Sequence, residues 1–344
     1  MTARAVIFGC ECLTVTDWER AFFAQTDPLG FILFARNCET PAQVRTLVTD
    51  LRACVGRADA PVLIDQEGGR VARLKPPHWR AAPAPARFGE MVPVDRDRAC
   101  EAVRLNARLL AAEVHDLGIT VDCVPLLDLR VAEADAVIGD RAFSADADVV
   151  ATLGRAVCDG MLAAGVMPVV KHMPGHGRAL VDSHHALPVV DTPRGELEAT
   201  DFSPFAALAD APWGMTAHVV YSAIDPQAPA TTSRIVVDEI IRGFIGFDGV
   251  LVSDDLSMQA LRGGLADRAA AALAAGCDVA LHCNGKAEEM TAVAGAVPAL
   301  TAAAERRLAA ATARLAHPPP LDELADMDMP AMCARLDGLM AAAG

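Results

Sequence analysis

Eight short, predominantly apolar runs, separated by longer helix-forming stretches, constrain the fold of this chain more than any other feature. They cover residues 5–9, 30–34, 61–65, 119–125, 166–172, 214–218, 249–253 and 277–282. Continuous apolar runs of this length are expected of strands that are buried on both faces of a parallel sheet. The sequence therefore predicts a sheet whose strands are all covered by other elements.

The stretches between these runs carry the end signals of helices. Residues 41–55 follow Thr40, a residue type suited to an N-cap, and begin with Pro41, a residue favoured at the first helical position. Residues 98–118, 146–165 and 261–276 each end at a glycine, as many helices do. Eight strands that alternate with helices predict an α/β fold, a single (β/α)8 TIM-type barrel. A doubly wound open sheet is the alternative, but no GxGxxG motif follows the first run.

The length of 344 residues suits one large domain or two ordinary ones. We assign residues 1–320 to the barrel and residues 321–344 to a helical tail that packs on or near it. The net charge of −15 disfavours nucleic acid and anionic membrane surfaces as partners. As partners we expect a small-molecule substrate only, and we expect a monomer.

The ten cysteines are scattered and form no paired CxxC clusters of the zinc type. The CxC of Cys10 and Cys12 is interpreted as two ordinary thiols. The N-terminal apolar run is too short for a signal peptide, and no run reaches a membrane-spanning length. We therefore expect a cytoplasmic protein with reduced thiols, no metal and no cofactor.

Polar residues follow five of the apolar runs at their carboxyl ends. They are Asp65, then Lys171 with His172, His218, Ser253 with Asp254, and His282 with Asn284. Any strand can end in polar loop residues, so a single case would carry little weight. Because active sites of this barrel fold lie at the carboxyl ends of the strands, five such ends favour one shared site.

Residues 171–188 (KHMPGHGRALVDSHHALP) contain four of the nine histidines. His172 and His176 have the spacing of a metal pair on a helix, but Pro174 and the nearby glycines forbid a regular helix, so we expect a loop over the barrel mouth. His176 either contacts a ligand or braces the loop.

In an extended segment of this loop, Asp182 and His184 point the same way. The carboxylate then fixes the tautomer of the imidazole and raises its pKa, which suits a general acid/base. Such a pair, taken alone, is more often an ordinary loop hydrogen bond. Farther along the chain, Asp254 follows a strand and suits attack on an anomeric carbon, whereas Asp255 could cap the next helix.

At this point the motifs KHMPGHG…DSH…LP, SDDLSM, LIDQEGGRVARL, IGDRAFS and GFILFARN resemble those of the family-3 glycoside hydrolases. More narrowly, they resemble the single-domain bacterial β-N-acetylglucosaminidases of peptidoglycan recycling. The similarity spans about residues 30–284 in unbroken motif order. It implies a retaining exo-enzyme that hydrolyses terminal β-linked GlcNAc from peptidoglycan fragments, GlcNAc-1,6-anhydroMurNAc and its peptides.

The resemblance also implies residue roles. Asp254 would be the nucleophile that forms a covalent glycosyl-enzyme intermediate, and His184 would be the acid/base with Asp182 as its partner. Asp65, Arg73, Arg141, Lys171 and His172 would hold the sugar hydroxyls and the N-acetyl group. Without the resemblance, Arg73 and Arg141 could equally be ordinary surface arginines.

The loop departs from the family pattern at Arg178 and Ala179, where the family often has Asp-Thr, and at Met173, where it often has Phe. The spacing of Asp182 and His184 is kept. Three alternatives remain open at this stage. They are a phosphorylase that uses phosphate in place of water, a sugar-binding protein without activity, and a Schiff-base aldolase that uses Lys171.

Overall fold

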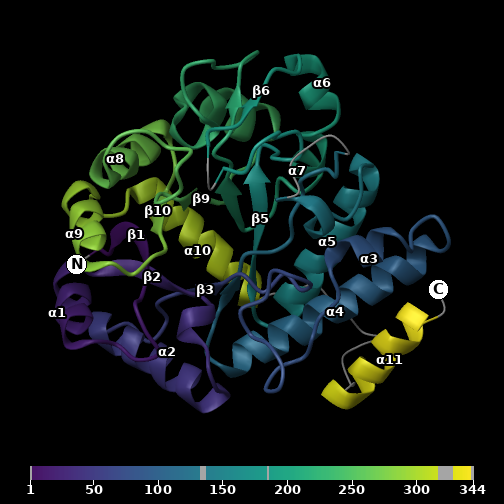
Figure 1. The fold of residues 1–344 in the computed structure, drawn as a ribbon, viewed down its shortest axis with the longest axis horizontal. Coiled ribbons are helices and arrows are strands. Elements are labelled where there is room, and N and C mark those ends of the chain that lie inside the picture. Colours follow the sequence, from purple (N-terminus) through teal and green to yellow (C-terminus); the bar gives the residue numbers. More distant parts are fainter. Residues whose placement is uncertain (1, 132–136, 184–185, 317–327, 342–344) are drawn as a thin grey trace.

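The computed structural model describes residues 2–131, 137–183, 186–316 and 328–341, which contain a closed barrel of eight parallel strands (Figure 1). The strands are β1 (Arg4–Gly9), β2 (Pro28–Leu33), β3 (Val62–Ile64), β4 (Val121–Asp122), β5 (Met167–Met173), β7 (Trp213–Thr216), β9 (Val250–Asp255) and β10 (Val279–His282). They pair in the order β1-β10-β9-β7-β5-β4-β3-β2. Each of the eight apolar runs overlaps one of these strands, so the predicted (β/α)8 TIM-type barrel is confirmed.

Helices connect the strands around the outside of the barrel. They are α1 (Asp17–Thr26), α2 (Pro41–Val55), α3 (Pro85–Gly89), α4 (Arg96–Asp116), α5 (Ala147–Ala163), α6 (Arg194–Ala199), α7 (Ser203–Ala207), α8 (Leu265–Ala275) and α9 (Ala287–Ala296). Shorter or irregular turns are η1 (Ala35–Asn37), η2 (Gly139–Arg141), η3 (Ala230–Thr232) and the π-helix η4 (Val236–Phe244). Helix α2 begins as its sequence predicts, since the Thr40 hydroxyl accepts a hydrogen bond from the Gln43 amide.

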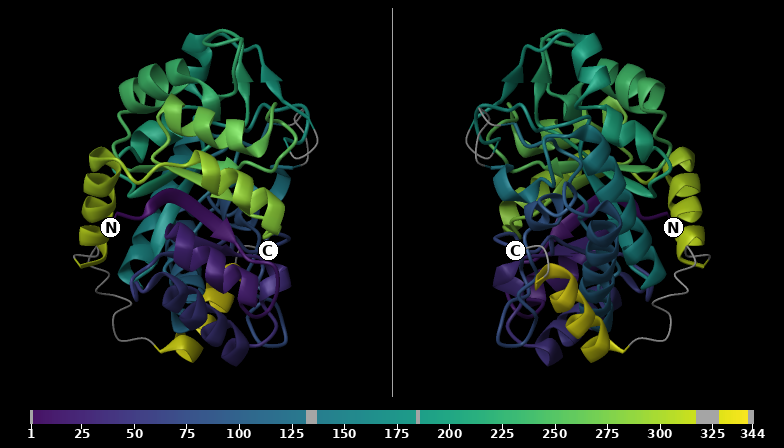
Figure 2. Two further views of the ribbon diagram at one scale, coloured as in Figure 1. Left: turned by 90° about the vertical axis from the view of Figure 1, so that its left-hand side faces the viewer. Right: turned by 90° about the vertical axis from the view of Figure 1, so that its right-hand side faces the viewer.

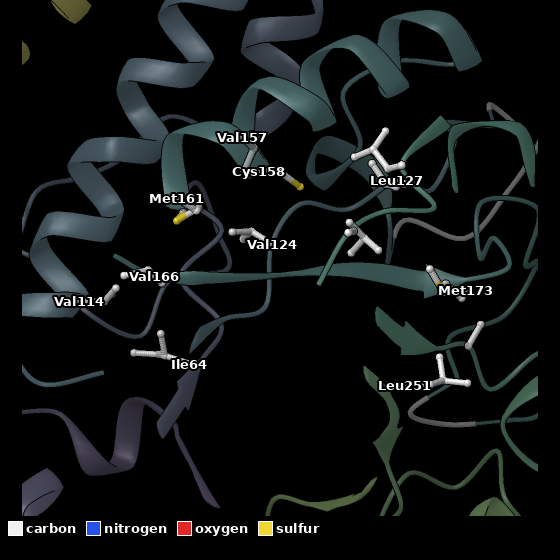
Figure 3. Close-up of a cluster of buried hydrophobic side chains, with 14 of the residues drawn as sticks. Ile64, Val114, Val124, Leu127, Val157, Cys158, Met161, Val166, Met173 and Leu251 are labelled. Atoms are coloured by element: carbon white, nitrogen blue, oxygen red, sulfur yellow. The ribbon is translucent and has the colours of Figure 1, made fainter. Parts of the chain in front are cut away.

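The strands bury side chains on both faces, which explains their apolar composition. In β5, Val169 points into the barrel interior with Ile7 and Leu63, while Val170 packs with the helices outside. Figure 3 shows part of the outer layer, where Val166 of the segment before β5 lies near Met161 of α5. Because both faces of the sheet are filled, only the two ends of the barrel can hold a site.

Helix α10 (Ala302–Ala316) covers the amino-terminal end of the barrel. Its Leu308, Ala311 and Leu315 pack with the interior cluster, and the Leu300 amide just before it bonds the Ala3 carbonyl. Figure 1 shows α10 crossing the centre of the barrel. The carboxyl end of the barrel therefore remains for a ligand.

Helix α11 (Met329–Ala341) lies against α4 at the outside of the molecule, as the right-hand view in Figure 2 shows. The Arg98 guanidinium of α4 donates to the Leu339 carbonyl at 2.8 Å. None of the helices in the described part of the chain is long and apolar enough to cross a membrane.

A small second sheet lies outside the barrel and was not predicted. It pairs β6 (Val189–Val190) with β8 (Val220–Tyr221) in parallel, with Val189 opposite Val220. Strands of two residues are too short to give a periodic pattern. This sheet fixes the chain immediately after the loop that ends at Pro188.

Candidate active site

A pocket of about 460 Å³ opens at the carboxyl ends of the barrel strands. This volume falls within the range of about 300–1,000 Å³ that is common for small-molecule sites. Seven of the eight residues predicted for the site line it, namely Asp65, Arg73, Arg141, Lys171, His172, Asp182 and Asp254. The eighth, His184, lies outside the described residues.

Alternating charges hold one wall of the pocket together. The Lys171 ammonium donates to Asp65 Oδ1 at 2.8 Å and also lies 2.8 Å from Glu67 Oε1. The Arg141 guanidinium binds both oxygens of Glu67 at 2.8 Å, and Arg73 donates to Asp65 Oδ2 at 3.0 Å. Two carboxylates and three cations from β5, η2 and the segment after β3 thus form one connected network.

The network keeps its members ionised although they are buried. Burial would raise the pKa of Asp65 and of Glu67, but Lys171 and the arginines hold both below their usual values. Burial would lower the pKa of Lys171, but Asp65 and Glu67 raise it well above its ordinary value. Fixed charges of this kind make strong, directional hydrogen bonds to the hydroxyl and amide groups of a ligand.

Glu67 is a functional residue that the sequence reasoning missed. Its side chain is only 1% exposed, yet it lines the pocket and fixes both Lys171 and Arg141. The signal was present, because Glu67 lies two residues after Asp65 in the quoted LIDQEGG motif and alternate residues of an extended segment share a face.

His172 is held by Asp128, a second residue that the sequence reasoning missed. The His172 Nδ1 atom lies 2.7 Å from Asp128 Oδ2, and Asp128 Oδ1 accepts from the His176 amide at 2.7 Å. Burial would raise the pKa of Asp128, but His172 and these hydrogen bonds lower it to about 2. An ionised Asp128 makes Nδ1 the donor and leaves Nε2 of His172 for a substrate.

His176 braces the loop, as one of the two alternatives for it expected, and it also lines the pocket. Its Nε2 atom lies 3.2 Å from the Ser183 hydroxyl. Burial and the neighbouring His172 lower its pKa to about 4, so it is neutral at pH 7. Its neighbour in the loop, Asp182, is half-buried at the pocket rim.

Asp254 stands near the end of β9 and faces the pocket. Burial would raise the pKa of its carboxyl. His172, His218 and the Asp255 amide, which donates to Asp254 Oδ1 at 2.8 Å, instead hold the pKa below its usual value. The carboxylate is therefore ionised at neutral pH, as a nucleophile must be.

The expectation that Asp255 caps the next helix is wrong. Strand β9 runs on through Asp255, whose Oδ1 accepts from the amides of Ser257 and Cys283. Asp255 also lines the pocket, although only one of the two aspartates was expected there. Helix α8 starts ten residues later, after Gly264.

Several polar strand ends do not contribute to the pocket lining. The His218 ring lies between the Thr231 hydroxyl, at 2.7 Å, and the Asp255 carbonyl, at 3.0 Å, so it supports the end of β9 from behind. His282 packs edge-on against Phe8 outside the barrel. The Ser253 hydroxyl accepts from the Leu281 amide at 2.9 Å, and the Asn284 side-chain amide donates to Glu289, so both side chains have protein partners.

No group of three or more His, Cys, Asp or Glu in the described ranges is arranged to hold a metal ion. The reactive groups on view are carboxylates, imidazoles, an ammonium and guanidinium ions. A parallel (β/α)8 barrel with a charged pocket at the carboxyl ends of its strands has the architecture of a barrel enzyme.

The chain belongs to glycosyl hydrolase family 3, because residues 14–317 match the model of the family's N-terminal domain. The resemblance seen in the motifs is thereby confirmed. A protein named beta-hexosaminidase from Chromobacterium violaceum is 41% identical over 288 residues, which cover 83% of this chain and 80% of the relative. One of the same name from Pseudomonas aeruginosa is 43% identical over 285 residues, 81% of this chain and 82% of the relative.

Solved structures agree with the family. The structure of NagZ from Neisseria gonorrhoeae in complex with N-trifluoroacetyl-D-glucosamine superposes with a TM-score of 0.86 at 30% identity, covering 99% of both chains. A family-3 beta-N-acetylglucosaminidase from a Paenibacillus species gives a TM-score of 0.84 at 31% identity. That match covers 98% of this chain and 67% of the relative.

Proposed function

We propose that this protein is a retaining exo-β-N-acetylglucosaminidase that removes terminal β-linked GlcNAc from peptidoglycan fragments. The observation that carries the proposal is that an ionised Asp254 carboxylate lines the same pocket as Asp65, Lys171 and Arg141, whose side chains are held in place by ion pairs. The names of the relatives support the acetylated hexosamine, and so does the N-acylated glucosamine held by the Neisseria protein.

In the proposed reaction, a carboxylate oxygen of Asp254 attacks the anomeric carbon and displaces the aglycone oxygen. His184, with Asp182 as its partner, gives a proton to that oxygen as the glycosidic bond breaks. The neutral imidazole then takes a proton from water, which attacks the glycosyl-aspartate and releases GlcNAc with its original configuration. A half-buried carboxylate that His172 and His218 help to keep ionised supports the first step.

The charge network would bind the sugar before the chemistry begins. Asp65 accepts hydrogen bonds from hydroxyls, and Lys171 and Arg141 donate to hydroxyl and N-acetyl oxygens, while Nε2 of His172 is left to share a hydrogen bond with a hydroxyl. Because each side chain is already held by a partner of opposite charge, little ordering is left for substrate binding.

The aldolase alternative is disfavoured by the state of Lys171. A Schiff base needs a neutral amine, and the carboxylates of Asp65 and Glu67 keep this lysine protonated. Borohydride should therefore trap no adduct with a carbonyl compound.

The test is hydrolysis of p-nitrophenyl β-N-acetylglucosaminide by the wild type and by Asp254→Ala, with and without phosphate. The expected result is free GlcNAc from the wild type without phosphate, and an inert variant. Formation of GlcNAc-1-phosphate that depends on phosphate would make the protein a phosphorylase. Binding of GlcNAc without turnover by either protein would leave a sugar-binding protein.

A further inference from the structure

The first part of the loop after β5 is fixed by contacts that lie outside the pocket. Residues 174–179 are almost entirely buried, whereas Leu180 and Val181 beyond them are exposed. Arg178 departs from the family pattern at this point, and its side chain leads away from the pocket to the segment around α6 and α7.

Arg178 holds three partners on that segment. Its Nε atom donates to Asp201 Oδ2 at 2.7 Å, and its NH1 atom lies 3.0 Å from Glu196 Oε1. Its NH2 atom donates to the Thr200 hydroxyl at 3.2 Å, and that hydroxyl donates in turn to Asp201 at 2.8 Å. A guanidinium can span these three acceptors because its donors lie in one plane.

Asp201 also supports the start of the loop. It is 2% exposed, and a Cβ atom placed on Gly175 would lie 3.1 Å from the Asp201 Cβ atom. Gly175 has a φ of +149°, which glycine adopts without strain. The Tyr221 hydroxyl donates to the Gly175 carbonyl, so Asp201 and Tyr221 together fix the backbone three residues before Arg178.

The other side of the loop is tied to the pocket. The His176 amide donates to Asp128, and the His176 ring contacts the Ser183 hydroxyl, next to Asp182. Asp182 lies four positions after Arg178, and Ser183 on its other side contacts the His176 ring at 3.2 Å. Asp182 therefore lies between two residues whose side chains are held by protein partners.

We propose that Arg178 is a positioning residue for proton transfer, which fixes the stem of the loop on Asp201 and thereby orients Asp182 at the pocket rim. This inference rests on the proposed function, because it assigns Asp182 to the acid/base pair. Arg178 does not line the pocket, so it acts through the loop and not on the substrate.

Substrates with different leaving groups can distinguish a role in proton transfer from a general structural role. Dinitrophenol leaves without a proton, whereas phenol or a sugar needs one from the general acid. Arg178→Ala should lower kcat/KM for the phenyl β-N-acetylglucosaminide by about tenfold or more, and for the dinitrophenyl glycoside by less than about twofold. Arg178→Lys keeps one charge opposite Asp201 and should recover part of the loss on the phenyl substrate.

Arg194→Ala is the matched control. Arg194 also belongs to this segment and binds Glu198 at 2.7 Å and Glu239 at 3.0 Å, but it has no bond to the described residues of the loop, 174–183 and 186–188. Its removal should leave both substrates unchanged. Asp201→Asn, which keeps the shape of Asp201 and removes its charge, should reproduce the pattern of Arg178→Ala and guards against a misfolded alanine variant.

These experiments test the role of Arg178 separately from the proposed glycosidase activity. If Arg178→Ala or Asp201→Asn slows both substrates equally, or neither, Arg178 has no specific role in proton transfer. If Asp182→Asn also shows no dependence on the leaving group, the assignment of the acid/base pair fails. If the wild type hydrolyses neither glycoside, the proposed activity itself fails.

Discussion

The two parts of the pocket differ in how they are held. The network of Asp65, Glu67, Lys171 and Arg141 is almost fully buried, and each of its side chains is paired with one of opposite charge. The loop stem, residues 174–179, is anchored by Asp128, Asp201 and Tyr221, whereas Leu180 and Val181 beyond it are exposed and Asp182 is half-buried.

From this difference we infer that the charge network serves sugar binding and that the loop serves proton transfer. Groups that recognise a sugar gain from being fixed before the substrate arrives, because no ordering is then required. A general acid must reach the leaving oxygen only when the glycosidic bond breaks, and a loop can deliver it. Regions with few buried contacts also open at low cost in free energy.

The largest effect is expected from Lys171→Met, which removes the central cation of the network. Two buried carboxylates then lose a partner, and breaking such pairs costs about 3–5 kcal/mol of the free energy of unfolding. Activity on the nitrophenyl glycoside should fall by about 1000-fold or more, equal to about 4 kcal/mol of transition-state stabilisation. Urea unfolding and steady-state kinetics measure the two effects.

Lys286→Met is the matched control for that change. Lys286 pairs with Glu289 at 3.0 Å, but its side chain is 70% exposed, and exposed pairs contribute less than about 1 kcal/mol. A stability loss for Lys171→Met no greater than that of the control would show that the network is not the rigid part of the site.

Asp182→Asn tests the loop and should separate activity from stability. The amide cannot stabilise an imidazolium, so the pKa of the acid/base histidine should fall, and kcat/KM should drop about 100-fold at neutral pH. The alkaline limb of the pH profile should move to lower pH. The free energy of unfolding should change by less than about 1 kcal/mol, because the site is a half-buried loop position. A large stability loss would contradict the contrast between loop and network.

The sequence predicted the barrel because strands buried on both faces are continuous apolar runs. It predicted Asp65, Lys171 and Asp254 as site residues because they lie at the carboxyl ends of such runs. It did not predict the Asp128–His172 pair. The partners are 44 residues apart on different βα units, and sequence spacing carries no information about a contact between neighbouring units. Period-two reasoning after strand β3 would have found Glu67.

Asp122→Asn is expected to have the smallest effect, and it contrasts with Asp65→Asn on the neighbouring strand. Asp122 is fully buried in β4, its Oδ1 accepts from the Gln66 amide at 2.9 Å, and its Oδ2 has no hydrogen-bond partner. Burial raises the pKa of Asp122 well above its usual value, whereas Lys171 and Arg73 hold the pKa of Asp65 below its usual value. An asparagine at residue 122 keeps the shape of the side chain and cannot ionise.

The two variants should depend on pH with opposite signs. Above about pH 4 the unfolded chain releases the Asp122 proton while the folded protein keeps it, so this residue costs the wild type stability as pH rises. The free energy of unfolding of Asp122→Asn should therefore rise relative to that of the wild type between pH 4 and pH 7. At pH 7 the two values should differ by less than about 1 kcal/mol. Asp65 stabilises the fold above about pH 4, and this contribution is lost as pH falls. The stability loss of Asp65→Asn relative to the wild type should therefore be greatest at neutral pH. Urea unfolding of the wild type and both variants from pH 4 to pH 8 gives the slope of the free energy of unfolding against pH for each protein. Parallel slopes would mean that Asp122 is ionised like Asp65, and the network would then contain three buried carboxylates instead of two.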